Sequence, residues 1–179
     1  MMISNDIFEK AKHLAIEYFA KANIVITEEE KGKIEVADFG LADLWTTGLE
    51  ILTYVNTARV CAKELVVLPY QTCPEHRHPV IGDYIGKEET FRCRYGTVYL
   101  YVDGEATENR GVEPPKGVYT VFHEIKLTEG QQYTLMPNTK HWFKAGASGA
   151  VISEFSTSSI DEGDIFTDEN IKRVPEVEE

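Results

Sequence analysis

The sequence has few cysteines and no paired cysteine motif. Cys61, Cys73 and Cys93 are odd in number, and no two of them have Cys-x-x-Cys spacing. This pattern excludes a disulfide framework and argues against a cysteine zinc site, and it suits a reducing compartment. We expect all three cysteines to be small buried hydrophobic side chains.

Positive charge is also scarce. The chain has 18 Lys and Arg residues against 30 Asp and Glu residues, which gives a net charge of −12. This field repels polyphosphate and anionic lipid, so we expect no nucleic acid or membrane partner and favour a small-molecule ligand. Residues 1–10 have early acidic groups and no long apolar run, so they predict neither a signal peptide nor a membrane span, and we expect a cytoplasmic protein.

Length and composition predict one domain. At 179 residues with 42% hydrophobic composition, the chain can bury a core of its own. Apolar side chains at helical spacing predict an amphipathic helix over residues 5–22, with its N-cap among residues 4–6. Thr27 and Glu30 have capping-box spacing, and Gly32 limits the helix that they predict to about two turns.

Short runs rich in β-branched and aromatic residues follow from Gly48 onward. No helix-length pattern interrupts them, so we predict an antiparallel β-barrel or jelly roll rather than a parallel βαβ fold. Within the single domain 1–179, we expect a helical cover at 1–47, a barrel at 48–156 and a C-terminal extension at 157–179 that lies back on the body before its tail frays. The predicted strands are 49–55, 59–68, 74–78, 89–95, 97–103, 118–126, 131–136, 141–145 and 149–156, and 104–117 is predicted as a surface loop.

Two histidines with alternate spacing, His76 and His78, project from one face if they lie on a strand. Glu89 begins a later strand on the face of Phe91, so its carboxylate points into apolar surroundings and needs a partner. That partner is a metal or a salt bridge to an arginine or lysine. Glu88 faces the other way, so we prefer Glu89 as the ligand.

His141 follows a predicted turn and precedes two large aromatic residues, which predicts a ligand held in an apolar pocket. His13 is predicted on the helix surface, and His123 is predicted as a core, outer-sphere or substrate-contacting residue. Three neutral imidazoles and one carboxylate, from His76, His78, His141 and Glu89, suit a divalent transition metal.

These residues resemble the two sequence motifs of the cupin family. The matching elements are His76-x-His78, Glu89-x6-Gly96 and Gly130 through Pro137 to His141. The gap between His78 and Glu89 is longer than usual in cupins, and the gap between Pro137 and His141 is one residue shorter. The resemblance implies a mainly β fold, a cupin-type antiparallel β-barrel with N-terminal helices, and a metal held by three histidines and one glutamate.

Longer runs resemble the D-lyxose isomerase family of cupins, from the first helix to Asp168. The runs are 61–65, 71–79, 86–96, 137–143 and 164–168. This resemblance implies a metal-dependent aldose–ketose isomerase that interconverts D-lyxose and D-xylulose, with activity on D-mannose and D-fructose. It implies Mn²⁺ as the cofactor, with Zn²⁺, Fe²⁺, Co²⁺ and Ni²⁺ as alternatives.

Proton transfer through a cis-enediol needs a base beside the substrate carbon. Glu154 and Lys63 each lie in an apolar strand-like run, and we predict Glu154 as the base and Lys63 as the group that polarises or protonates a hydroxyl. A Lys63–Glu154 salt bridge without a catalytic role is the alternative. The predicted sugar contacts and walls are Asp164, Tyr95, Tyr119, Trp142 and His123, with Asp168 as a weaker candidate.

Three rival functions use a similar site. A cupin sugar-phosphate isomerase would need a cationic cluster, for which Arg77, Arg92 and Arg94 are candidates, although they alternate with the inward face. An Fe(II) dioxygenase and a non-enzymatic sugar-binding cupin with a structural metal are the others.

Exposed sheet edges predict a homodimer.

Overall fold

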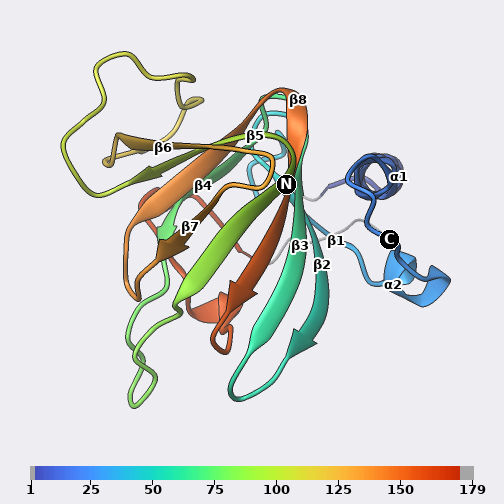
Figure 1. Cartoon of the computed structure of the whole chain (residues 1–179), viewed down its shortest axis with the longest axis horizontal. Coiled ribbons are helices and arrows are strands. Elements are labelled where there is room, and N and C mark those ends of the chain that lie inside the picture. The colour runs from blue at the N-terminus through green and yellow to red at the C-terminus, as the bar shows by residue number, and fades with distance from the viewer. Residues whose placement is uncertain (1–2, 174–179) are drawn as a thin grey trace.

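The protein, analysed as a computed structural model, is described over residues 3–173. It is a curled antiparallel sheet with two helices beside it (Figure 1). The elements are α1 (Asn5–Lys21), α2 (Glu28–Gly32), β1 (Glu35–Ala37), β2 (Leu49–Asn56), β3 (Cys61–Val67), β4 (Thr72–Arg77), β5 (Glu89–Val102), β6 (His123–Thr128), β7 (Gln132–Leu135), β8 (His141–Ser156), the 3-10 turn η1 (Asp161–Gly163) and β9 (Ile165–Phe166).

Two long strands, β5 and β8, pair with each other at the centre of the sheet. The free edge of β8 is covered by β4 along its first half and by β3 along its second half. The free edge of β5 is covered in the same way by β7 and then β6. The inward side chains of these strands form one buried apolar cluster, which confirms the predicted mainly β, cupin-type antiparallel fold.

Each central strand had been predicted as two shorter strands, and this division is wrong. Gly96 and Gly149 have positive φ angles of 73° and 71°, and the β5–β8 register shifts beside Gly96. A Cβ on Gly96 would lie 2.0 Å from the Gly149 carbonyl oxygen. The glycines therefore permit bulges that bend the two strands together, where the sequence had indicated turns.

Other strand boundaries differ for local reasons. The strand predicted at 118–126 begins only at His123, and β1 and β9 were not predicted. With three and two residues, β1 and β9 are too short to show an alternating pattern. Their positions depend on pairing with β2 and β4, which a local pattern does not encode.

The helix α1 lies on the outside of the sheet. Its N-cap is Ser4, whose hydroxyl accepts a hydrogen bond from the Ile7 amide at 3.4 Å. Its buried face, which includes Phe19, packs with Leu52 and Val66 from the outer face of the sheet. The helix therefore leaves the barrel interior free. The predicted helix α1 and the predicted capping box at Thr27 of α2 are both confirmed. No helix within residues 3–173 is long and apolar enough to cross a membrane.

The segment Thr157–Arg173, here called the C-terminal arm, folds back across one end of the barrel. Its strand β9 pairs with β4, and the Lys172 amide donates to the Phe39 carbonyl at 2.9 Å. The arm therefore lies on the body of the protein, as predicted. The acidic tail 175–179, which was predicted to fray, lies outside the described residues.

A buried carboxylate, Glu50 of β2, lies between the sheet and the Leu44 region. Its Oε1 accepts a hydrogen bond from Gln71 at 3.1 Å, and its Oε2 has no partner among the described residues. Burial raises the pKa of Glu50 to about 8, although hydrogen bonds from Gln71 and the backbone oppose the rise. The folded protein therefore binds a proton here that the unfolded chain releases near pH 4.5.

Replacing this carboxyl group should change how stability depends on pH. Because folding raises the pKa of Glu50, the neutral carboxyl group stabilises the folded protein fully at pH values below the pKa of the unfolded chain. This stabilisation is lost as the pH rises toward 8. Glu50→Gln should therefore gain unfolding free energy over wild type between pH 5 and pH 9, by up to roughly 5 kcal/mol. Urea denaturation at several pH values measures this gain. The exposed variant Glu108→Gln is the control, and a pH-independent effect of Glu50→Gln would contradict the assignment.

Candidate metal centre

Three histidines from two neighbouring strands meet inside the barrel. His76 lies on β4, His78 follows the end of β4, and His141 begins β8 opposite His76 in the strand register. All three are buried, and their ligand nitrogens lie within 4.8 Å of one another. The alternation of the strand and the β4–β8 pairing thus produce a group of residues that can hold a metal ion.

The three imidazoles are oriented in the same way. In each ring, Nδ1 lies within hydrogen-bond distance of an oxygen atom, which leaves Nε2 to face the other histidines. The partners are Pro74 O for His76 (2.8 Å), Thr139 O for His141 (3.0 Å) and Asp164 Oδ1 for His78 (2.5 Å). These contacts favour the tautomer that carries its proton on Nδ1 and keeps Nε2 for a ligand.

Glu89, the first residue of β5, completes the group. Its Oε1 lies 3.2 Å from His78 Nε2 and 3.1 Å from His141 Nε2, and its side chain is 1% exposed. Glu88 is exposed, as the alternation predicted. Burial alone would raise the pKa of Glu89, but Lys87 and His78 outweigh it and hold the pKa well below its usual value.

The residues present fit a divalent transition metal. His141 Nε2 is buried and has no hydrogen-bond partner among the described residues, although Glu89 lies close by. Burial, together with His141 and His78, holds the pKa of His76 well below its usual value, so this imidazole is neutral with a free lone pair. Three imidazole nitrogens and one carboxylate form a donor set typical of zinc, iron or manganese sites.

Lys87 is a buried residue of the site that the sequence analysis did not identify. Its Nζ lies 2.7 Å from Glu89 Oε2 and 2.9 Å from Glu154 Oε1. Burial would lower the pKa of Lys87, but Glu154 and Glu89 raise it well above its usual value, so the ammonium group stays charged. Lys87 is two residues before Glu89 and thus has the same parity, a signal that could have identified it. A salt bridge to a lysine was the alternative to a metal as the partner of Glu89, and Lys87 is that lysine.

Glu154 and Lys63 are buried and face each other across the β3–β8 register. The salt bridge that was the alternative to their catalytic roles does not form between them among the described residues. Lys63 Nζ instead lies 2.8 Å from Asp161 Oδ2 and donates to the Ser159 hydroxyl at 3.2 Å, while Glu154 is bound by Lys87. The reason is that the C-terminal arm brings Asp161 within reach of the lysine. The arm had no predicted strand, so this partner was not foreseen.

Most of these groups line a cavity whose lining includes His76 and His78. The lining carries the charged groups already described, together with Arg173, Asp161 and Asp164 of the arm. Its apolar part, here called the apolar wall, is formed by Leu49, Ile51, Leu65, Phe91, Phe143 and Phe166. Such a chamber offers charged groups for polar chemistry and an apolar surface that limits the access of water.

The three aromatic residues predicted to contact the sugar do not line this cavity. Trp142 follows the inward His141 and so faces the other side, where it stacks on Tyr101 with ring centroids 4.0 Å apart. Tyr119 packs against the same indole. Tyr95 lies beyond the bulge in β5 and packs edge-on against Tyr18 of α1.

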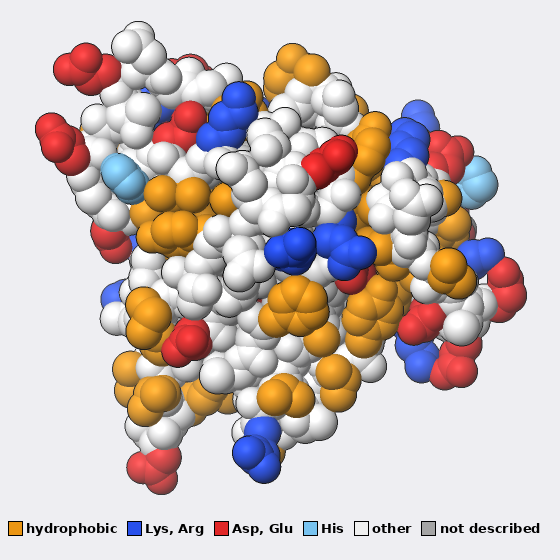
Figure 2. Space-filling view, in the orientation of Figure 1, with side chains coloured by type: hydrophobic (Ala, Val, Ile, Leu, Met, Phe, Trp, Pro, Cys, Tyr) orange, Lys and Arg blue, Asp and Glu red, His pale blue; other side chains and the backbone are white. Residues whose placement is uncertain are grey.

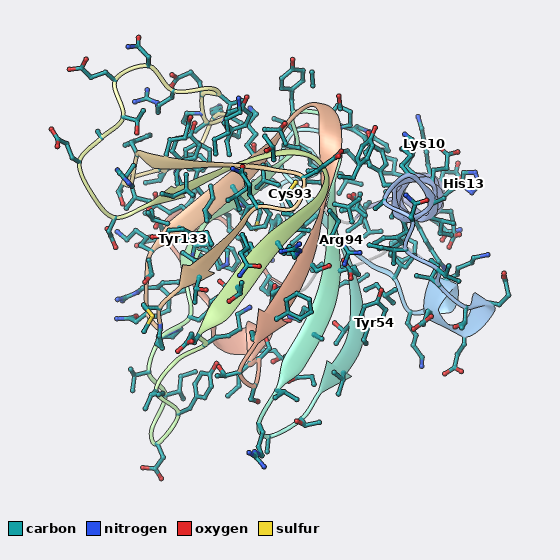
Figure 3. All side chains as sticks on the ribbon, in the orientation of Figure 1. Lys10, His13, Tyr54, Cys93, Arg94 and Tyr133 are labelled. Carbon is teal, nitrogen blue, oxygen red and sulfur yellow. The ribbon has the colours of Figure 1, made fainter. Side chains whose placement is uncertain are left out.

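The other histidines also lie outside the cavity. His123 Nδ1 is 3.0 Å from the Glu105 carbonyl oxygen at the start of β6. His13 lies exposed on α1 (Figure 3), as predicted. Asp168 lies at the surface and binds Asn170. Asp164 reaches the cavity, but its near partner is His78.

Comparisons with solved structures show the same fold. The L-ribose isomerase of Cellulomonas parahominis with L-psicose superposes with a TM-score of 0.72 at 17% identity, over 94% of each chain. The L-ribose isomerase of Acinetobacter sp. DL28 gives a TM-score of 0.69 at 17% identity, over 88% of this chain and 82% of that one.

Sequence comparisons give much closer relatives. The chain is 60% identical to the D-lyxose/D-mannose isomerase of Thermosediminibacter oceani, over 99% of this chain and all of that protein. It is 54% identical to the D-lyxose ketol-isomerase of Cohnella laeviribosi, over 96% of each. The sequence profile of the family described as D-lyxose isomerase matches residues 17–179. This chain therefore belongs to the D-lyxose isomerase family.

Proposed function

We propose that the protein is an aldose–ketose isomerase that interconverts D-lyxose and D-xylulose, and D-mannose and D-fructose by the same chemistry. The observation that carries the proposal is the meeting of three histidines and Glu89 with the Lys87–Glu154 ion pair in one cavity. The relatives named for D-lyxose and D-mannose isomerisation support it, because they match this chain over nearly its full length.

In this proposal His76, His78, His141 and Glu89 hold a divalent cation, with Mn²⁺ as the native ion. When bound, the cation would supply Lewis-acid polarisation of the sugar carbonyl. Because only one of the four ligands is a carboxylate, the ligand set leaves the ion electrophilic. The apolar wall limits water, which strengthens the electrostatic interactions around the reacting carbons.

Glu154 is the proposed base. It removes the proton from C2 of the aldose and delivers a proton to C1, while the O2 hydroxyl proton moves to O1, so the cis-enediol becomes the ketose with no other reactant. Lys87 holds Glu154 in position through their 2.9 Å contact. Lys63, held by Asp161 at 2.8 Å, polarises or protonates a substrate hydroxyl from the facing strand.

An unphosphorylated sugar is the better-supported substrate class. The three arginines considered for phosphate binding make contacts outside the cavity, and none of them is among its lining residues. Their partners are Asn138 for Arg77, Gln132 for Arg92 and Ser153 for Arg94. Arg173 lines the cavity, but it is paired with Glu35 and Asp161, which leaves no free cationic cluster there.

We also propose that residues 1–179 act as one domain that forms a homodimer in the cytoplasm. The outer face of the sheet carries exposed apolar side chains beside basic ones (Figure 2). Tyr54, Val55 and Phe155 are 42%, 40% and 51% exposed, and Tyr54 and Arg94 lie on this face (Figure 3). A second copy would cover such a patch.

Activity should depend on a divalent cation and on the aldose. Protein stripped with a chelator should lose its isomerase activity, and Mn²⁺ should restore turnover of D-lyxose because the four ligands lie preformed. A panel of aldoses, each assayed with Mn²⁺, Zn²⁺, Co²⁺, Fe²⁺ and Ni²⁺ by ketose formation, measures this. If no ketose forms from any aldose with any ion, the non-enzymatic sugar-binding alternative replaces the proposal. Oxygen uptake with Fe²⁺ would instead favour a dioxygenase.

Replacing the proposed base should remove proton exchange. Glu154→Gln should lower kcat by about 10²- to 10⁴-fold, because the amide cannot accept the C2 proton. Deuterium incorporation at C2 of D-lyxose in D₂O, followed by NMR, should be lost in parallel. The matched control is Glu64→Gln, a buried carboxylate on the outer face of β3 that binds Ser153. Exchange at the wild-type rate in Glu154→Gln would show that another group is the base.

A further inference from the structure

One of the three histidines is held differently from the others. His76 and His141 are each oriented by a backbone carbonyl two residues earlier in the same segment. His78 has a carboxylate partner instead, Asp164 Oδ1 at 2.5 Å, and Asp164 lies 86 residues further along the chain. The orientation of two histidines is therefore local, whereas that of His78 depends on a contact with the C-terminal arm.

The same arm contacts the rest of β4. The Thr167 amide donates to the Glu75 carbonyl at 3.0 Å, and the Thr167 hydroxyl donates to the Glu75 carboxylate at 2.6 Å. The ring of Phe166 lies 5.4 Å from that of His76, at an interplanar angle of 33°. The arm thus supplies neighbours to two of the three histidines, and only Asp164 supplies a charged one.

We propose that Asp164 is a positioning residue that fixes the ring of His78 for metal binding through their direct contact. A carboxylate that accepts the Nδ1 proton fixes the tautomer and the ring plane and makes Nε2 a better ligand. This inference rests on the proposed metal site, and it goes beyond the ligand set by naming the residue that acts through His78.

The geometry distinguishes this role from the sugar contact predicted for Asp164. Its side chain is only 6% exposed, and Oδ1 is committed to His78. The neighbouring Asp161 binds Lys63 and Arg173, so the two acidic residues of the arm that line the cavity have separate partners. Asp164 therefore acts on the metal centre, whereas Asp161 acts on Lys63 and Arg173.

Metal affinity tests the proposal without relying on turnover. Chelator-stripped protein is titrated with Mn²⁺ by calorimetry. Asp164→Asn should weaken Mn²⁺ binding by about 10- to 100-fold, the usual cost of losing such a partner. The matched control is Thr167→Val, which removes an arm contact with Glu75 but leaves the Asp164–His78 pair. It should lower the melting temperature of the metal-free protein and leave Mn²⁺ affinity within about twofold of wild type.

Each outcome has a defined meaning. Equal Mn²⁺ affinity in wild type and Asp164→Asn, or an equal loss in Thr167→Val, would overturn the positioning role and leave the metal site intact. Failure of the wild type to bind any divalent ion would overturn the metal site and this inference together. If Asp164→Asn folds poorly, a second measurement on the wild type tests the inference. ¹⁵N-edited NMR of the Zn²⁺-loaded wild type should show a slowly exchanging Nδ1 proton on His78, and its absence would also overturn the inference.

Discussion

The contact of Lys87 with Glu89 and Glu154 is the interaction on which the site depends. A buried ammonium or carboxylate group costs several kcal/mol unless it is paired, and these three groups are at most 4% exposed. Lys87 lies 2.7 Å from Glu89 and 2.9 Å from Glu154, so one cation offsets two buried anions. It also joins the candidate metal ligand to the candidate base, which fixes where chemistry on a substrate would take place.

The remaining charged side chains that line the cavity follow the same rule. Lys63 and Arg173 share Asp161, and Arg173 also pairs with Glu35. Because both sets of charges are buried beside an apolar wall, neither can rearrange without leaving an unpaired group. These ion pairs form only when strand β3, the C-terminal arm and the loop before β5 are all in place. The cavity therefore depends on the whole fold.

Local rules predicted the parts of the site that lie within one strand. Alternation placed His76, His78 and Glu89 on one face, and it also separated Glu89 from Glu88. The same rule, applied to Trp142 beside the inward His141, would have placed the indole outside. Tyr95 could not be placed in this way, because the bulge in β5 changes the parity and a bulge is not visible in the alternation itself.

Contacts between distant segments could not be predicted, because parity fixes a face but not a partner. Lys63 and Glu154 do face each other in register, yet each binds another residue that a connecting segment brings closer. The helix α1 and the long runs of β strands were predictable, since their patterns extend over many residues. The strand of the arm was not, because β9 has two residues and its position depends on β4, although the return of the arm to the body was predicted.

The unusually long gap between His78 and Glu89 now has a structural reason. The loop that fills it leaves β4 and returns to begin β5, and Gly86 at a φ of 95° passes so close that a Cβ would lie 2.7 Å from the His78 carbonyl oxygen. Only glycine fits this approach without strain. The residue after it is Lys87, so the close return of the loop delivers the ammonium group between Glu89 and Glu154. The departure from the common cupin spacing therefore lies in the segment that carries the bridging lysine.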